Sequence, residues 1–347
     1  MFNTVITDIY SGKTATKDLF NYYSDNLKKG VSGVLNSDKY GDKYYELQAK
    51  LQANVSRFSA YKAYKAGKEL EALRTNDNGT IRSKKDYEKI AKATLNMYNR
   101  WQVAEYNATV SRSRTAEQWQ RFNENSIENE LYPNIEWLPS MSAEQREEHK
   151  KFYNQVWTKN DPFWDTNQPG NLWGCKCDWR TTDKPPTNPN VATRTAAAGL
   201  DGNPGKTGQI FSEDASYIKN NLDKESEIYS ILRKENLEAA FKKLKDVTVE
   251  KQTKTEKINV SFTKKGLEHL QHDFFPNKWL KNIILQNIDK VLEKAEFVDE
   301  AKDAKNNIMI EKYYYYKITL FDKDYLLNIR KLKTGEAYLY SLTNRKA

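Results

Sequence analysis

Apolar residues recur at spacings of three and four along much of residues 1–130, which is the pattern of helices with one packed face. The clearest run follows Ser83 and Asp86, a candidate N-terminal cap. The stripe behind this cap consists of Tyr87, Ile90, Thr94, Met97, Trp101, Ala104 and Ala108, and an earlier stripe consists of Leu47, Leu51, Val55 and Phe58. The pattern predicts a mainly α N-terminal module built as a helical bundle.

This periodicity is lost in residues 131–180. Six of the eight tryptophans lie between positions 119 and 179, among Pro133, Pro139, Pro162 and Pro169, which interrupt regular structure. We therefore expect residues 131–180 to form an irregular, Trp-rich unit held together by aromatic burial. Residues 181–210 are rich in Pro, Gly, Asn and Thr, and we expect a linker or an extended arm there.

The pattern changes again toward the C-terminus. Residues 211–256 read as a helical connector, and residues 257–347 are predicted to start with a short strand near 258–262, followed by helical stretches. Three β-rich runs follow at 313–321, 325–333 and 337–342, the last two joined by the hairpin signal Thr334-Gly335. This order predicts a small α+β domain with an antiparallel sheet, so the chain as a whole is expected to be multidomain.

The composition is that of a polar globular protein with a basic balance. The 347 residues are 38% hydrophobic and 30% charged, with a formal net charge of +9. A basic balance favours nucleic acid or an acidic protein surface as a partner. No stretch reaches the roughly 18 apolar residues of a membrane span, so we expect no membrane partner. Cys175 and Cys177 are one residue apart, which excludes a disulfide framework between distant segments.

His149, Cys175 and Cys177 form a candidate metal set. Thiolates and an imidazole could hold zinc, with Asp178, Asp161 or water as the fourth ligand. However, the C-x-C spacing is tighter than the spacing of most structural zinc sites. The alternative is a buried histidine that is hydrogen-bonded beside two packed thiols.

The segment NPGKTG at 203–208 invites comparison with a phosphate-binding loop. The spacing does not fit, because Leu200 stands where that motif needs its first glycine and no apolar strand leads into the segment. We interpret it as a turn.

Residues 136–179 resemble the Mu F-like phage head morphogenesis family, whose members are minor head or portal-associated proteins. The matching residues are Arg146 and His149, then Asp161, Pro162, Phe163 and Trp164, then Pro169, and finally Trp173, Gly174, Cys175, Lys176 and Cys177. Ser142 stands where the family usually has an aspartate. Asn54, Phe58, Trp101 and Glu105 upstream and NPGKTG with Phe211 downstream extend the resemblance over residues 1–215, the latter resembling versions from phages of Bacteroidetes-like bacteria.

This resemblance implies a protein that associates with the portal and other head proteins during assembly and enters the virion in few copies. The expected locations are the virion and, during assembly, the host cytoplasm. Contact with DNA is a further expectation, because Lys and Arg side chains bind phosphates without reading sequence. The alternative is a purely structural assembly protein whose charge is ordinary solvated helix surface.

The C-terminal domain contains residue types that cleave RNA without a metal or other cofactor. Such cleavage needs a proton acceptor and donor, cations around the phosphorane and hydroxyl groups that position the phosphate. We assign proton transfer to His269 and stabilisation of the phosphorane to Lys264, Lys265 and Arg330. Ser341 and Thr343 are expected to position the phosphate. The KKGLEHL opening and the YSLT ending resemble small ribonucleases of the barnase, EndoU, colicin and RelE superfamily, although Arg330 is assigned from chemistry alone.

The ribonuclease hypothesis has one structural requirement. The imidazole of His269 and the hydroxyls of Ser341 and Thr343 must face each other across a cationic pocket wide enough for a sugar-phosphate. An inactive nuclease-like fold and an unrelated α+β accessory domain are the alternatives.

Overall fold

The computed structural model describes residues 1–36, 42–124, 126–187, 195–272, 277–303 and 305–343. The chain divides into two compact units, Met1–Tyr229 and Ser230–Ala347. The first unit is mainly helical and the second combines helices with a sheet, so the predicted multidomain fold class is confirmed. Among the described residues, no helix combines the length and apolar character that crossing a bilayer requires.

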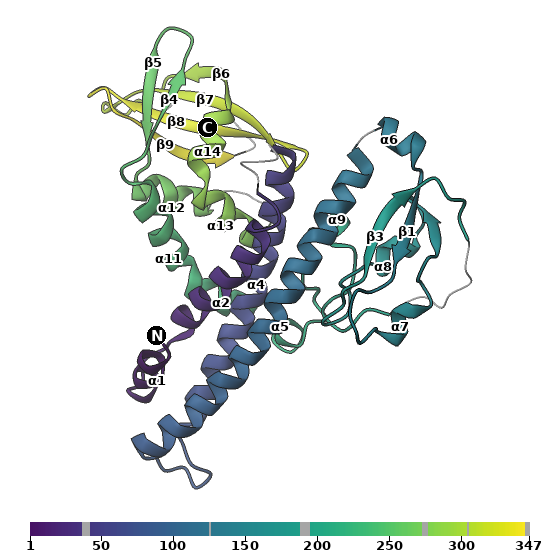
Figure 1. Cartoon of the computed structure of the whole chain (residues 1–347). Helices are drawn as coiled ribbons and strands as arrows, with labels where there is room; N and C mark the ends of the chain where they lie inside the picture. The colour runs from purple at the N-terminus through teal and green to yellow at the C-terminus, as the bar shows by residue number, and fades with distance from the viewer. Residues whose placement is uncertain (37–41, 125, 188–194, 273–276, 304, 344–347) are drawn as a thin grey trace. The chain divides into compact units, whose positions relative to one another are not determined.

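Long helices form the body of the first unit. They are α1 (Phe2–Tyr10), α2 (Thr16–Ser32), α4 (Asp42–Ala72), α5 (Lys84–Glu124) and the short α6 (Ser126–Leu131). Helix α2 packs against both α4 and α5, and the three lie side by side in Figure 1. The predicted start of α5 is correct, since the Ser83 hydroxyl accepts the Asp86 N–H at 3.2 Å. The stripe of Leu47, Leu51, Val55 and Phe58 is buried as expected.

The buried face of α5 differs from the predicted stripe. Trp101 is 41% exposed, whereas its neighbours Gln102 and Glu105 are buried. The cause is an internal polar cluster, in which the buried Lys62 ammonium of α4 donates to Gln102 at 2.8 Å and to Glu105 at 2.5 Å. Because these polar groups satisfy each other inside the bundle, the helix turns an aromatic residue toward solvent.

The Trp-rich unit is built around a small antiparallel sheet. Its strands are β1 (Asn134–Leu138), β2 (Val156–Thr158) and β3 (Asp178–Thr182), in the order β2-β1-β3. Two one-turn helices, α7 (Glu147–Lys150) and α8 (Phe163–Thr166), occupy the connections. The aromatic core consists of Trp119, Phe122, Trp137, Phe152, Trp157, Trp164 and Trp179. Since Trp119 and Phe122 belong to α5, the bundle and this unit share one core.

The second half of the expected linker is packed rather than extended. Leu200 and Ile210 are fully buried, and the Arg112 guanidinium of α5 donates to the carbonyls of both at 2.8 Å. This part of the chain contains α9 (Pro204–Thr207), and α10 (Ser216–Lys219) and the 3-10 turn η1 (Leu222–Lys224) follow in the expected connector. Asn203 caps α9 by accepting the Gly205 N–H at 2.9 Å, so NPGKTG forms a capped turn as interpreted. Residues 188–194 lie outside the described part.

Helix α11 (Glu225–Leu244) leads into the second unit, whose described residues form six strands and three further helices. The elements are β4 (Thr248–Gln252), β5 (Lys257–Ser261), α12 (Lys264–His272), α13 (Lys278–Gln286), α14 (Ile288–Lys294), β6 (Glu296–Ala301), β7 (Ile310–Leu320), β8 (Lys323–Leu332) and β9 (Ala337–Thr343). The three predicted β-runs and the hairpin at Gly335 are present, whereas β4 and β6 were not predicted.

The sheet of this unit is mixed, so the prediction of an antiparallel sheet is wrong in one respect. The strand order is β4-β5-β9-β8-β7-β6, and β5 and β9 pair in parallel. The reason is topological: the helices and three strands between β5 and β9 return the chain to β5 in the same direction. The other adjacent strands of this sheet pair antiparallel. Figure 1 shows this sheet with α12, α13 and α14 beside it.

Candidate functional site

The three residues of the candidate metal set come together in the Trp-rich unit. His149 Nδ1 lies 3.4 Å from Cys175 Sγ and 3.6 Å from Cys177 Sγ. All three potential ligand atoms lie within 4.8 Å of one another, on α7 and on the loop just before β3. His149 is fully buried, Cys175 is buried and Cys177 is partly exposed. The sequence hypothesis that these side chains converge therefore agrees with the geometry.

The orientation of His149 is fixed from its far side. Its Nε2 lies 2.8 Å from Oδ1 of the fully buried Asn171, and this oxygen can only accept a hydrogen bond. The proton therefore resides on Nε2, and the lone pair of Nδ1 faces the two sulfurs. A partner of this kind behind the ring is what metal-ligating histidines usually have.

The groups around the two sulfurs favour the deprotonated, thiolate form of Cys175. The backbone N–H groups of Gly170 and Cys177 point at Cys175 Sγ from 3.5 and 3.4 Å. The hydrogen bond from the Cys177 thiol, helped by the Gly170 N–H, holds the pKa of Cys175 well below its usual value, although burial opposes this. The pKa of Cys177 is raised, because its proton is shared with Cys175 and its sulfur is partly buried.

The two aspartates considered as fourth ligands have other roles. Asp161 Oδ1 accepts the Phe163 N–H at 2.8 Å and so caps α8. Asp178 Oδ1 accepts the Trp179 N–H at 2.8 Å and the Gln118 side-chain amide at 3.1 Å. The remaining alternative is water, and both cysteines line a cavity of about 740 Å³ that also borders α5.

The residues of the family resemblance surround this cluster. Arg146 donates to the carbonyl oxygen of Trp173 at 2.6 Å. Gly174 has a φ of +72°, and a side chain there would crowd the Arg146 guanidinium at 3.2 Å. This glycine permits the turn that brings Cys175 and Cys177 to His149.

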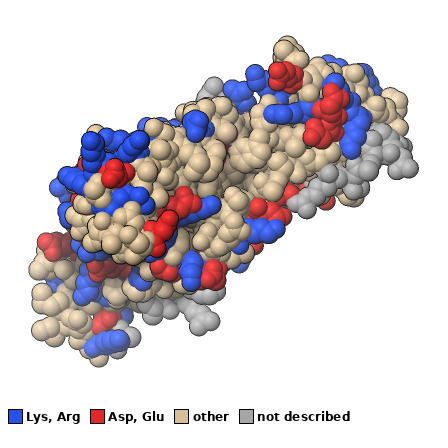
Figure 2. All heavy atoms as spheres, turned by 90° about the horizontal axis from the view of Figure 1, so that it is seen from below, with Lys and Arg blue, Asp and Glu red and all other residues tan. Residues whose placement is uncertain are grey.

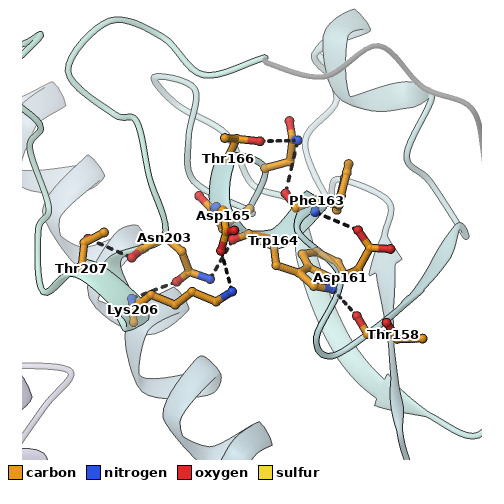
Figure 3. Close-up of polar contacts among 12 residues, drawn as sticks. Thr158, Asp161, Phe163, Trp164, Asp165, Thr166, Asn203, Lys206 and Thr207 are labelled. Carbon is orange, nitrogen blue, oxygen red and sulfur yellow. Dashed lines mark hydrogen bonds and ion pairs between the residues drawn. The ribbon is translucent and has the colours of Figure 1, made fainter.

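The segments DPFW and NPGKTG, about 40 positions apart in the sequence, touch in space (Figure 3). The Asn203 side chain donates to the Trp164 carbonyl at 3.0 Å, and Lys206 pairs with Asp165 at 2.6 Å. The indole of the fully buried Trp164 donates to the Thr158 carbonyl at 2.9 Å. Phe163 stacks on Trp157 with ring centroids 3.8 Å apart, next to Pro162 at the start of α8. These contacts hold the DPFW and NPGKTG segments against each other.

The predicted ribonuclease residues lie in two places on the second unit. Arg330 and Ser341 share one face of the sheet, because Asn328 pairs with Ser341 in register and Arg330 follows two positions later in β8. The Arg330 guanidinium lies 3.7 Å from the ring of Tyr340, whose centroid is also 4.5 Å from that of His269. Tyr340 thus packs against both groups that were expected to face an open pocket.

The remaining predicted residues lie at the ends of two elements. Lys264 and Lys265 are exposed at the start of α12, and Lys264 pairs with Glu238 at 2.5 Å. Thr343 lies at the end of β9, opposite Leu326.

Sequence reasoning missed the most unusual polar residue of this sheet face. Asn328 is fully buried, and neither atom of its amide has a hydrogen-bond partner. The same holds for Arg330 Nε, two positions along the strand. The only available signal was a lone asparagine in an otherwise apolar run, DYLLNIR, which is weak because asparagine also occurs at bulges and turns.

The Arg112 and Asn54 side chains were also missed as organising residues, although Asn54 belongs to the family resemblance. Both bind backbone groups of residues 200–211. No local pattern reveals this role, since their partners are about 90 and 157 positions away.

Comparison with known proteins finds one matching family model and a partial match to a capsid assembly protein. Residues 229–339 match the family model described as "Large polyvalent protein-associated domain 3". A stretch of 48 residues is 38% identical to the "Putative capsid assembly protein F" of Escherichia phage Mu. This stretch is 14% of the present chain and 11% of the length of that protein. No solved structure is significantly similar to the chain. The chain is thus similar in part to a phage capsid assembly protein, and residues 229–339 are similar to a large polyvalent protein-associated domain.

Proposed function

We propose that this chain is a minor head protein of a phage or prophage, and that it joins the head beside the portal during assembly. The observation that carries the proposal is the 38% identity with the capsid assembly protein of phage Mu. The packing of Arg146, Asp161, Trp164 and Gly174 around one Trp-rich core supports it, because the motif residues form a single folded unit.

Proteomics of purified virions tests this proposal. Virions from a host carrying this gene are expected to contain the chain at a few copies per particle, and the chain is expected to copurify with the portal protein when both are coexpressed. A second head protein from the same particles serves as the positive control. Absence of the chain from virions in which that control is detected contradicts the head role. Incorporation without portal copurification contradicts only the portal contact.

DNA contact is a narrower part of this proposal. The net charge of +9 supports it, but on the face drawn in Figure 2 basic and acidic side chains are interspersed rather than segregated. Binding through scattered phosphate contacts would be independent of sequence and would weaken steeply with salt. Filter binding to two unrelated duplexes between 50 and 200 mM salt, about the range over which such contacts fail, tests it. Binding that is absent at low salt removes DNA as a partner.

A second candidate function is ribonuclease activity of the C-terminal unit. It is favoured by Arg330 and Ser341 on one sheet face with His269 close by. The Tyr340 ring against both Arg330 and His269 argues against an open pocket. The full chain should be incubated with RNA in the presence of a chelator, beside His269→Ala and, as a matched control, His272→Ala. Cleavage that His269→Ala alone abolishes supports the activity. If the wild type and both variants cleave RNA equally, or if none of them cleaves it, the proposed ribonuclease activity is rejected.

A further inference from the structure

The distances between the ligand atoms of His149, Cys175 and Cys177 match those expected around a bound metal ion. Zinc binds sulfur at about 2.3 Å and imidazole nitrogen at about 2.0–2.1 Å, so two such ligands at a tetrahedral angle lie about 3.5 Å apart. The two observed nitrogen–sulfur distances are 3.4 and 3.6 Å. Both nitrogen–sulfur distances therefore match the spacing of ligands around a single zinc ion.

The chemistry of the ligands agrees with these dimensions. Asn171 keeps the proton of His149 on Nε2 and leaves Nδ1 free to bind a metal. Two backbone N–H groups approach Cys175 Sγ, an arrangement that stabilises a thiolate. The reverse turn that supplies the second of these N–H groups, from Cys177, also explains how a C-x-C pair presents both sulfurs on one side.

The fourth coordination position is not provided by the residues proposed from the sequence. Asp161 and Asp178 are used as backbone caps. Both cysteines border the cavity of about 740 Å³, whose lining also includes Ser111, Arg114 and Gln118 of α5. A zinc site with three protein ligands and one position toward a cavity keeps that position for an exchangeable ligand.

We propose that His149, Cys175 and Cys177 bind one zinc ion, and that its fourth ligand is a water molecule facing the cavity beside α5. The ion joins α7 to the loop before β3 and so fixes the turn at Gly174. This inference goes beyond the role in the phage head and does not depend on it, because it rests on the geometry of the cluster alone.

Metal analysis of the full-length chain, purified without an affinity tag, tests the proposal. One zinc per chain is expected in the wild type, and loss of zinc is expected in Cys175→Ser and Cys177→Ser. Asn171→Ala, which removes the partner of Nε2, is expected to weaken zinc affinity by about 10–100-fold. His272→Ala is the matched control and should keep full occupancy. Substoichiometric zinc in wild-type protein that has been exposed to excess zinc overturns the proposal, as does unchanged zinc in Cys177→Ser.

Cobalt substitution removes the ambiguity of variants that fail to fold, because it uses the wild-type chain. Replacing zinc by Co2+ is expected to give the strong visible bands of four-coordinate cobalt and a thiolate charge-transfer band. Addition of 2-mercaptoethanol should shift the visible bands, since a thiol can replace the water. Absence of the charge-transfer band overturns the metal site. Bands that do not respond to the thiol overturn the open fourth position.

Discussion

The side-chain amide of Asn54 on α4 pairs with the backbone of Phe211 in both directions. Its Nδ2 donates to the Phe211 carbonyl at 2.8 Å, and its Oδ1 accepts the Phe211 N–H at 2.8 Å. The same Oδ1 accepts the N–H of Ile210 at 2.9 Å. One buried side chain thus takes the place of a neighbouring strand and attaches the segment after NPGKTG to the helical bundle.

Asn54→Ala is expected to lower the free energy of unfolding of the first unit by about 3 kcal/mol. The change leaves two N–H groups and one carbonyl of a buried segment without partners, and each such group costs about 1–3 kcal/mol. Tryptophan fluorescence during urea unfolding measures the effect, because seven of the eight tryptophans lie in this unit. Asn26→Ala, which removes a bond to Tyr22 within α2, is the control and should cost far less. Equal costs for both variants would contradict the bridging role.

Arg112 is the second residue that holds this segment. Its fully buried guanidinium donates to the carbonyls of Leu200, Gly202 and Ile210 at 2.8 Å each. Arg112→Met is expected to destabilise the unit by at least about 3 kcal/mol, because these carbonyls lose charge-assisted bonds that nothing else replaces. Limited proteolysis should then cleave within residues 197–211, whereas Arg114→Met, an exposed change two positions away, should resist like the wild type. Resistance of both variants would show that the segment is held by its apolar side chains instead.

These residues show where the sequence was informative about the fold and where it was not. Periodicity identified α4, α5 and the strands β7, β8 and β9, because each has a long stretch of one repeat. It placed the ends of the α5 stripe correctly, since Tyr87 and Ala108 are buried, but missed its middle, where Trp101 is exposed and Gln102 and Glu105 are buried. Hydrophobic patterns assume that polar residues face water, and a polar cluster that satisfies itself internally violates that assumption.

Part of the candidate site was predictable because of how rare its residue types are. Histidine and cysteine are rare in this chain, so His149, Cys175 and Cys177 could be selected by type alone. The roles of Asn171 and Arg112 could not be selected, because asparagine and arginine are common and their partners are distant in sequence. The pairing of β5 with β9 was equally hidden, since parallel pairing of distant strands leaves no local signal.

The buried pair of Lys62 and Glu105 provides a third prediction. Burial raises the pKa of Glu105 and lowers the pKa of Lys62, and the attraction between them opposes both effects. Lys62→Met alone is expected to cost about 3–5 kcal/mol, because it leaves an unpaired buried carboxylate. The double variant Lys62→Met/Glu105→Leu should recover most of this loss, since it leaves neither charge. Urea unfolding of the two single variants and the double variant measures the coupling, and strictly additive losses would contradict it.

The carboxylate of Glu136 in β1 gives the pH dependence of the Trp-rich unit. Burial opposes its ionisation, but hydrogen bonds from Lys184 and Arg180 at 2.7 and 2.8 Å outweigh this and lower the pKa of Glu136. A carboxyl group whose pKa is lower in the folded state than in the unfolded state stabilises the fold. The full contribution is present at pH values above the unfolded-state pKa of about 4.5. It is lost as the pH falls through the folded-state pKa. Stability should therefore drop below about pH 4.5. Glu136→Gln should flatten this part of the profile, measured by thermal unfolding between pH 3 and 7. An unchanged slope would assign the acid sensitivity to other groups.

The contact between α12 and β9 makes the C-terminal unit sensitive to a single methyl group. The Cβ of an alanine at Gly266 would overlap the backbone carbonyl oxygen of Leu339, and neither backbone can yield without separating the helix from the sheet. Gly266→Ala is therefore expected to destabilise this unit by about 1–3 kcal/mol through overpacking, despite the better helix propensity of alanine. Hydrogen exchange of the β8 and β9 amides measures the effect in this unit alone, with Lys265→Ala, an exposed neighbour on the same helix, as the control. Slower exchange in Gly266→Ala would mean that propensity outweighs the steric contact and that α12 does not rest directly on β9.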